Sequence, residues 1–219
     1  ADAIAQGITT ADGSKLNYPD VALALWESSS TMTARKLADL LWDQGIGTEK
    51  IGQAMGELGF SLEDIADAVY DGITRKDGTP LKNFFNVTQA LWNSGYDLNA
   101  RQLSVLLWNE GALLSQIVSA IKYVGGSVEV VADALDDGLR QGPAPGVDYK
   151  FIAYALSNSQ YSISAQKLAD VLWDEGASAK EIGRALKFVG HNLGTILDAV
   201  KNGVTTENGR LLNHLDVTD

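Results

Sequence analysis

The sequence predicts an all-α fold, built as a tandem array (solenoid-like or multi-bundle) of repeats of about 65 residues. Each repeat would hold four short helices and an Asp-Gly or Asn-Gly turn. The segment TARKLADLLWDQG at 33–45 returns as NARQLSVLLWNEG at 99–111 and as SAQKLADVLWDEG at 164–176. Its tryptophans, Trp42, Trp108 and Trp173, lie 66 and 65 residues apart. Self-similarity at a fixed period is typical of repeat proteins, and no segment alternates as a long strand does.

The spacing defines three full repeats, at 8–72, 73–138 and 139–203. Residues 1–7 match the end of a repeat, and residues 204–219 match the start of one. We therefore expect the chain to open with the end of a preceding repeat and to stop within a following one. A segment taken from a larger protein would have this pattern.

Each repeat opens with a turn, written GITTADGSKL, GITRKDGTPL and GLRQGPAPGV in the three repeats and GVTTENGRLL after them. Asp-Gly and Asn-Gly favour tight turns with positive φ. Pro143 and Pro145 in the third turn require a different geometry there.

Short polar residues stand four positions before the first aliphatic residue of most expected helices. There they can cap free backbone N–H groups. These residues are Asn17, Asn83, Asp148 and Asn213 for the first helix, Thr33, Asn99 and Ser164 for the second, and Ser61, Ser127 and Asn192 for the fourth. The third helix follows Gly47, Leu113 and Ser178.

Glycines are placed to end the helices in the left-handed conformation. They are Gly45, Gly111 and Gly176 after the second helix, Gly59, Gly125 and Gly190 after the third, and Gly72, Gly138 and Gly203 after the fourth. Helices as short as these are marginal alone, so packing between neighbours must hold them.

The composition of the chain excludes several kinds of function. The chain of 219 residues carries a net charge of −11, which disfavours binding to nucleic acid and to anionic lipid. It has no cysteine, which excludes disulfides, thiolate metal sites and cysteine nucleophiles. No apolar run is long enough for membrane insertion. We expect an extracellular or cell-surface location, although the composition also suits a cytoplasmic protein.

Two aromatic sets are candidate ligand-binding residues. Trp26 and Trp92 occupy one position of the first helix, where the third repeat has Ser157, so we expect partial exposure. They would serve either a contact between repeats or a ligand. Tyr18, Phe84, Tyr149 and His214 share a second position, more typical of a rim over the turn than of a binding row.

One carboxylate persists in the fourth helix, as Asp2, Asp67, Asp133 and Asp198. We expect these residues to pair with Arg35, Arg101 or Lys167 and to hold one repeat against the next. No second acidic ligand keeps a fixed offset from them, so no metal or other cofactor is expected.

No catalytic arrangement is evident in the sequence. The two histidines, His191 and His214, lie in unrelated places, and no arrangement of nucleophile, base and orienting group occurs once in the chain. We therefore expect a protein that is not an enzyme. The leading hypothesis is a non-catalytic segment of a structural, surface or adhesive protein that contacts other proteins or neighbouring repeats. The alternative is a module that binds peptide or glycan in a groove lined by Trp26, Trp92 and nearby aromatic residues.

Overall fold

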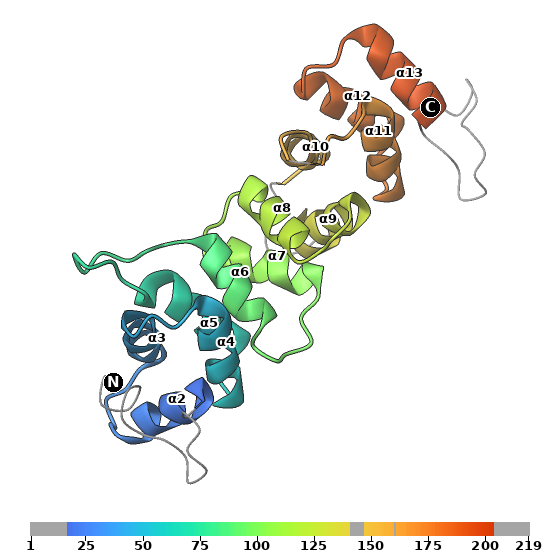
Figure 1. Ribbon diagram of the computed structural model, residues 1–219. Coiled ribbons are helices and arrows are strands. Elements are labelled where there is room, and N and C mark those ends of the chain that lie inside the picture. Colours follow the sequence, from blue (N-terminus) through green and yellow to red (C-terminus); the bar gives the residue numbers. More distant parts are fainter. Residues whose placement is uncertain (1–16, 141–146, 160, 204–219) are drawn as a thin grey trace. The chain divides into compact units, whose positions relative to one another are not determined.

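The computed structural model describes residues 17–140, 147–159 and 161–203 (Figure 1). These residues form twelve α-helices and two short π-helical segments, which confirms the all-α class. The predicted partial repeats at 1–7 and 204–219 lie outside the described residues, as do Asp2, Asn213 and His214. The same holds for all or part of three predicted turns, including Pro143 and Pro145.

The chain divides into two compact units. The first comprises Ala1–Asn99 with Asn109–Gly111, and the second Ala100–Trp108 with Ala112–Asp219. This division cuts through the predicted repeat at 73–138 and does not fall at either of its ends. The physical reason is that the first helix of this repeat packs on helices of the preceding repeat.

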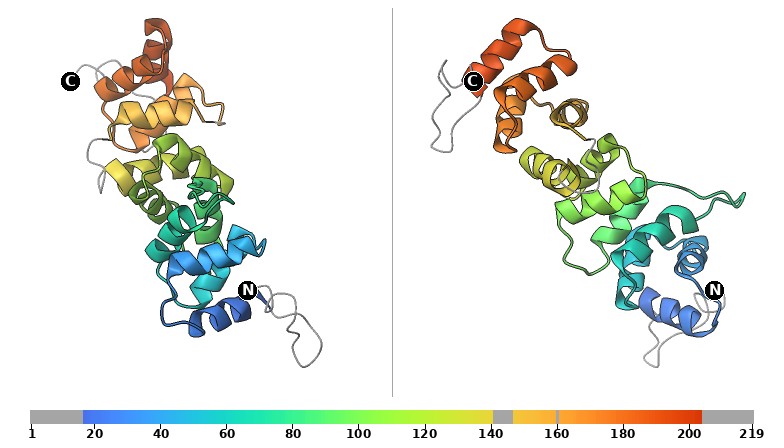
Figure 2. Two further views of the ribbon diagram at one scale, coloured as in Figure 1. Left: turned by 90° about the vertical axis from the view of Figure 1, so that its left-hand side faces the viewer. Right: turned by 180° about the vertical axis from the view of Figure 1, so that it is seen from behind.

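The first unit contains helices from the first predicted repeat and the first helix of the second. They are α2 (Tyr18–Glu27), α3 (Ala34–Asp43), α4 (Thr48–Glu57), α5 (Leu62–Asp67), its π-helical continuation η1 (Ala68–Gly72), and α6 (Phe84–Trp92). Helix α4 lies beside both α2 and α6, and α3 lies beside η1 (Figures 1 and 2). The core of this unit is aliphatic, with Leu37, Leu41, Ile51, Met55 and Ile65 fully buried.

The second unit holds the remaining helices. They are α7 (Ala100–Asn109), α8 (Leu114–Tyr123), α9 (Val128–Leu135), η2 (Asp136–Arg140), α10 (Tyr149–Ser157), α11 (Ala165–Asp174), α12 (Ala179–Phe188) and α13 (Leu193–Gly203). Helix α10 packs against both α8 and α12, and α11 packs against α13. In the described residues no buried side-chain nitrogen or oxygen lacks a hydrogen-bond partner.

The predicted caps explain where the helices begin. Among the described caps, nine accept a hydrogen bond from a backbone N–H in the first turn, as expected of short polar side chains at this place. They are Asn17, Thr33, Ser61, Asn83, Ser127, Asp148, Ser164, Ser178 and Asn192. Ser178 also forms the capping box with Glu181 that its sequence indicates.

The glycines end the helices in two different ways. Those after the second and third helices have positive φ, from 76° at Gly45 to 96° at Gly190, as predicted. Gly72 is the last residue of η1, as predicted, whereas Gly138 lies inside η2; neither has the predicted positive φ. Their small size serves close packing: a Cβ on Gly72 would stand 2.7 Å from the Cα of Arg35 in α3.

The turn at 72–81 is a small hairpin. Thr74 and Pro80 form an isolated antiparallel bridge, and the Leu81 N–H donates to the Ile73 carbonyl at 2.8 Å. Gly78 has φ 79°, as the Asp-Gly pair predicts. The N–H and hydroxyl of Thr74 both donate to Asp39 in α3, each at 2.8 Å, which fixes the turn on that helix. Within the described segments, no helix combines the length and the apolarity needed to cross a membrane.

Candidate functional site

The two predicted tryptophans lie at the end of the first helix of their repeats and are partly exposed. The Trp26 ring is half-buried and meets Phe60 edge to face, with ring centroids 4.7 Å apart. The Trp92 side chain is 41% exposed and makes no hydrogen bond or ring contact with the described residues. Ser157, at the same place in α10, is exposed as well. Because the position reaches solvent, it can accept a small polar residue without opening a cavity.

The second aromatic set is not a continuous binding row. Phe84 and Tyr149 are buried, at 8% and 7% exposure. Phe84 stacks on Tyr70 with centroids 4.6 Å apart, and Tyr149 lies under the Arg140 guanidinium at 4.5 Å. Tyr18 alone of the three is exposed, with Lys50 over its ring at 4.6 Å. Phe84 and Tyr149 therefore help to pack neighbouring elements together, and their role in ligand binding stays a prediction.

The retained carboxylates form ion pairs within one repeat. The Arg35 Nε donates to Asp67 at 2.7 Å, and the Arg101 Nε donates to Asp133 at 2.8 Å; a second bond from each guanidinium makes both pairs bidentate. Each pair joins the second helix of a repeat to the fourth helix of the same repeat. The expectation that these aspartates hold one repeat against the next is therefore wrong.

The third pair also differs from the prediction. Asp198 accepts from Gln166 at 3.3 Å, and Lys167 instead binds Glu129 at 2.6 Å. Gln166 is the residue that stands where Arg101 stands in the preceding repeat. Lys167 and Glu129 belong to adjacent predicted repeats, so this ion pair does cross from one repeat to the next.

One glutamate comes close to each of the first two ion pairs. Glu110 lies near Asp67 and Asp71, and burial followed by these two charges raises its pKa. Glu175 has the same environment in the second unit. Burial, followed by the charges of Asp133, Asp136, Asp137 and Asp174, raises the pKa of Glu175 to about 7. A carboxyl group with such a pKa can exchange protons near neutral pH. These clusters are acidic contacts between helices.

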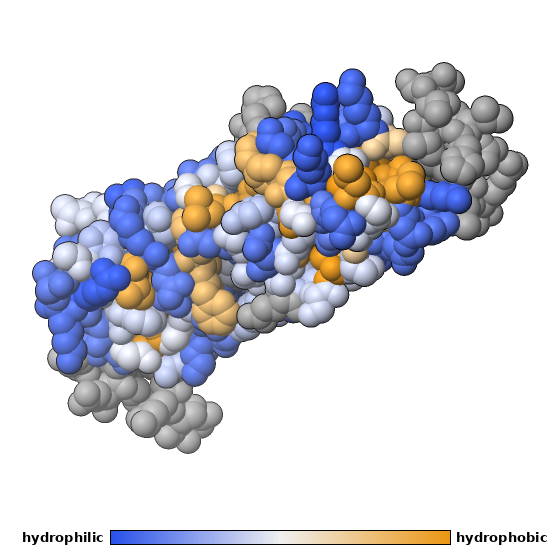
Figure 3. Space-filling model, turned by 90° about the horizontal axis from the view of Figure 1, so that it is seen from above, coloured by the Kyte–Doolittle hydropathy of each residue, from blue (hydrophilic) through white to orange (hydrophobic). Residues whose placement is uncertain are grey.

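An exposed aromatic cluster lies on α10 and α12. Phe151, Tyr154 and Phe188 are 39%, 52% and 48% exposed. The Phe188 ring meets Phe151 at 6.0 Å and Tyr154 at 5.9 Å between centroids, both edge to face. Exposed aromatic groups that touch one another are more typical of binding surfaces than single exposed apolar residues are. Figure 3 shows that apolar side chains reach the surface in several places among hydrophilic ones.

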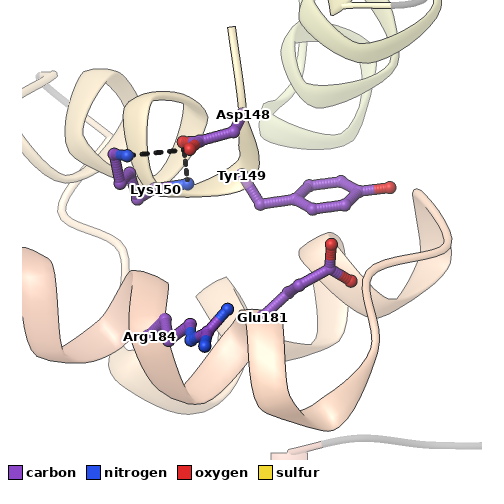
Figure 4. Close-up of a pocket in the computed structure, with 5 residues that line it drawn as sticks. All are labelled: Asp148, Tyr149, Lys150, Glu181 and Arg184. Carbon is purple, nitrogen blue, oxygen red and sulfur yellow. Dashed lines mark hydrogen bonds and ion pairs between the residues drawn. The ribbon is translucent and has the colours of Figure 1, made fainter.

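A pocket of about 360 Å³ opens between α10 and α12, close in sequence to this cluster. Figure 4 shows Asp148, Tyr149 and Lys150 on one side of it, and Glu181 and Arg184 on α12 opposite. Lys150 binds Asp148 at 2.9 Å, and Glu181 accepts two hydrogen bonds from Ser178, which lower its pKa.

Most of the polar groups in the pocket already have partners. The Tyr149 hydroxyl donates to the Glu175 carbonyl at 2.7 Å. Arg184 alone among the lining side chains has no hydrogen bond or ion pair with the described residues. The pocket thus has mixed charge with one available guanidinium, and it contains no nucleophile paired with a base. In the described part of the chain, no three acidic or histidine side chains come together so that they could hold a metal ion.

Comparisons with known proteins give no identification. No family model matches the chain, and no curated protein or solved structure shows significant similarity to it. The function must therefore be argued from the contacts themselves.

The aromatic cluster is the feature that the sequence did not indicate. Phe151, Tyr154 and Phe188 correspond to Asn86, Gln89 and Tyr123 in the second repeat, so the cluster does not recur. Recurrence is a good guide to packing, and a site present in one repeat leaves no such mark. The available signal was the divergence of the third repeat from the others.

Proposed function

We propose that this chain is a non-catalytic helical repeat protein whose repeats pack in series and whose exposed surfaces contact other proteins. The observation that carries the proposal is that a specific contact recurs at the repeat spacing. Arg35 binds Asp67, and the residues 66 positions further on, Arg101 and Asp133, form the same bidentate pair. A sequence pattern without structural meaning would not reproduce the geometry of a side-chain pair.

Helix positions support the same register. The first helices begin at 18, 84 and 149, the second at 34, 100 and 165, the third at 48, 114 and 179, and the fourth at 62, 128 and 193. Each helix type is thus displaced by 66 and then by 65 residues. These are the displacements of the helix-borne tryptophans.

A second recurring contact links adjacent repeats. The Tyr96 hydroxyl donates to the Phe60 carbonyl at 2.7 Å, and the Tyr161 hydroxyl donates to the Gly126 carbonyl at 2.6 Å. Each tyrosine follows the first helix of its repeat, and each acceptor follows the third helix of the repeat before. Ser30 stands at this place in the first repeat. Contacts of this kind, between nearest neighbours only, are what hold a repeat array together.

The acidic, cysteine-free composition and the recurrent packing residues favour a structural, adhesive or other contact role at the cell surface. Shortening the chain to residues 1–138 tests the architecture. The first two repeats should keep their helical circular dichroism and a cooperative unfolding transition, because they depend on neighbours and not on the whole chain. A shortened chain without helical structure would contradict the proposal.

The aromatic cluster favours a second candidate function, the binding of a peptide or glycan. Exposed aromatic faces beside a pocket with a free guanidinium suit such ligands. If this function is right, Phe188→Ala and Tyr154→Ala should each abolish binding to arrayed peptides or oligosaccharides. Tyr123→Ala, at the place of Phe188 in α8, is the matched control and should leave binding unchanged.

A further inference from the structure

The first helix of the second and third repeats buries a face that the first helix of the first repeat leaves exposed. In α6, Phe84 and Ala90 are 8% and 0% exposed, and Ala155 of α10 is 2% exposed. In α2, whose preceding repeat lies outside the described residues, the equivalent Tyr18 and Ala24 are exposed. Within the described segments, the face of α2 that carries these two side chains is therefore without the cover that α6 and α10 receive.

The structure shows what covers that face in α6. Ala90 lies against Gly52 of α4, so closely that a Cβ on Gly52 would stand 2.0 Å from the Ala90 carbonyl oxygen. Phe84 stacks on Tyr70 of η1. The third and fourth helices of one repeat thus form a seat for the first helix of the next.

Among the described residues, nothing covers the equivalent seat on α12 and α13. Leu197 of α13 is 63% exposed, whereas Ala66 and Ala132 at the equivalent positions are 1% and 0% exposed. Gly183 of α12, the equivalent of Gly52, meets nothing closer than 3.9 Å from its notional Cβ. In the part of the chain that the structure describes, the seat on α12 and α13 thus presents an apolar surface.

The helices that carry the two open faces also differ in charge. Helix α12 carries Lys180 and Lys187, which lie three residues before and four residues after Gly183 and so on the same side of the helix, whereas Arg184 lines the pocket beside α10. Helix α2 has the anions Asp20 and Glu27 and no cation. This local complementarity favours contact between the two faces even though the whole chain carries a net charge of −11.

We propose that α2 of one molecule docks on α12 and α13 of a second copy of this chain, as α6 docks on α4 and α5 within one molecule. The inference rests on the repeat architecture proposed above. Because the two faces differ, the contact is heterologous, and each dimer keeps one free face of each kind. Association should therefore continue head to tail into longer species.

Two variants and a control test the proposal by sedimentation velocity of the full chain over a broad range of concentration. Ala24→Arg blocks the face on α2, and Leu197→Arg blocks the face on α13; both residues are exposed, so the fold should survive, as circular dichroism can verify. The control is Gln53→Arg, which adds the same charge outside the proposed contact. Its position is exposed in α4 and at the equivalent places in α8 and α12.

The wild type and Gln53→Arg should show a sedimentation coefficient that rises with concentration. Ala24→Arg and Leu197→Arg should each lose this dependence completely. Mixing these two variants should restore association, but only to a dimer. The Ala24→Arg molecule keeps the face on α13 and the Leu197→Arg molecule keeps the face on α2, so one of each can join and no further molecule can add. A symmetric dimer could not produce this pattern.

A wild type that stays monomeric at every concentration would overturn the proposal, and so would single variants that associate normally or a mixture that stays monomeric. Cover of α13 by residues 204–219 of its own chain would give the first of these results. The shortened chain 1–138 separates the two proposals. If it folds while the full chain stays monomeric, the repeat architecture stands and only head-to-tail docking is wrong.

Discussion

Gly52 in α4 and Ala90 in α6 are in direct backbone contact, so that no side-chain atom fits between them. A Cβ atom on Gly52 would stand 2.0 Å from the Ala90 carbonyl oxygen and 2.5 Å from its Cα. One turn later, a Cβ on Gly56 would stand 1.8 Å from the Ser94 carbonyl oxygen. The two glycines thus set the distance between α4 and α6.

The variant Gly52→Ala should destabilise the protein, although alanine is the better helix former. The added methyl meets backbone atoms that cannot rotate away, and such overpacking costs about 2 kcal/mol. Urea denaturation followed by circular dichroism measures the effect. The matched control is Gly183→Ala, at the same register of α12, where the space is open; it should stabilise the protein by up to about 1 kcal/mol. Equal effects at both positions would contradict the close contact.

Stability should depend on pH through Glu175. Its pKa is about 7 in the folded protein against an ordinary value of 4.5, so the folded state holds this proton more tightly than the unfolded state does. The stabilisation of the folded state by this bound proton is fully present below pH 4.5, the ordinary pKa, and is lost as the pH rises through about 7. The groups that face this carboxyl group are Arg101, Asp133, Asp136, Asp137, Tyr149 and Asp174.

The variant Glu175→Gln should remove this dependence. Relative to the variant, the wild type should lose about 1 kcal/mol of unfolding free energy between the two pKa values, after allowance for solvent screening of a half-buried group. Denaturation at a series of pH values measures the difference. The exposed Glu27→Gln serves as control, and a constant difference between wild type and Glu175→Gln would show that burial does not perturb this carboxyl group.

The ion pair between Asp136 and Arg140 should matter more than the exposed pairs. Asp136 is 1% exposed, and both of its carboxylate oxygens accept from the Arg140 guanidinium. The variant Arg140→Met leaves a buried carboxylate without its cation, which costs about 3 kcal/mol. Arg35→Met, which breaks an exposed pair, should cost less than about 1 kcal/mol. Thermal unfolding of both variants tests this order, and a larger loss for Arg35→Met would contradict it.

The sequence predicts well what depends on nearby residues. Helix starts follow from side chains such as Asn17 and Ser61, and most helix ends follow from glycines such as Gly45, because capping and left-handed turns are local chemistry. The left-handed conformation predicted for Gly72 is wrong, since its close contact with Arg35 comes from packing across 37 residues of chain. Lys167 was paired wrongly because Gln166 and Lys167 are adjacent, and only the helix face decides which of them meets Asp198.

Exposure could be predicted only in part. The change from Trp26 and Trp92 to Ser157 indicated a position near solvent, and the structure agrees. The burial of Phe84 and Tyr149 depends on Tyr70 and Arg140, which recurrence alone does not place beside them. The cluster of Phe151, Tyr154 and Phe188 arises where two helices of one repeat meet, so no spacing along the chain indicates it.

The most direct test of the repeat architecture is to excise residues 73–138 and measure the circular dichroism and the thermal unfolding of the joined chain. If the repeats are equivalent, α10 takes the place of α6, and Ala155 takes the place of Ala90 against Gly52. The joined chain that lacks residues 73–138 should then keep the helical content per residue of the full chain and unfold in one cooperative transition. A chain that loses its helices, or melts without cooperativity, would contradict the account.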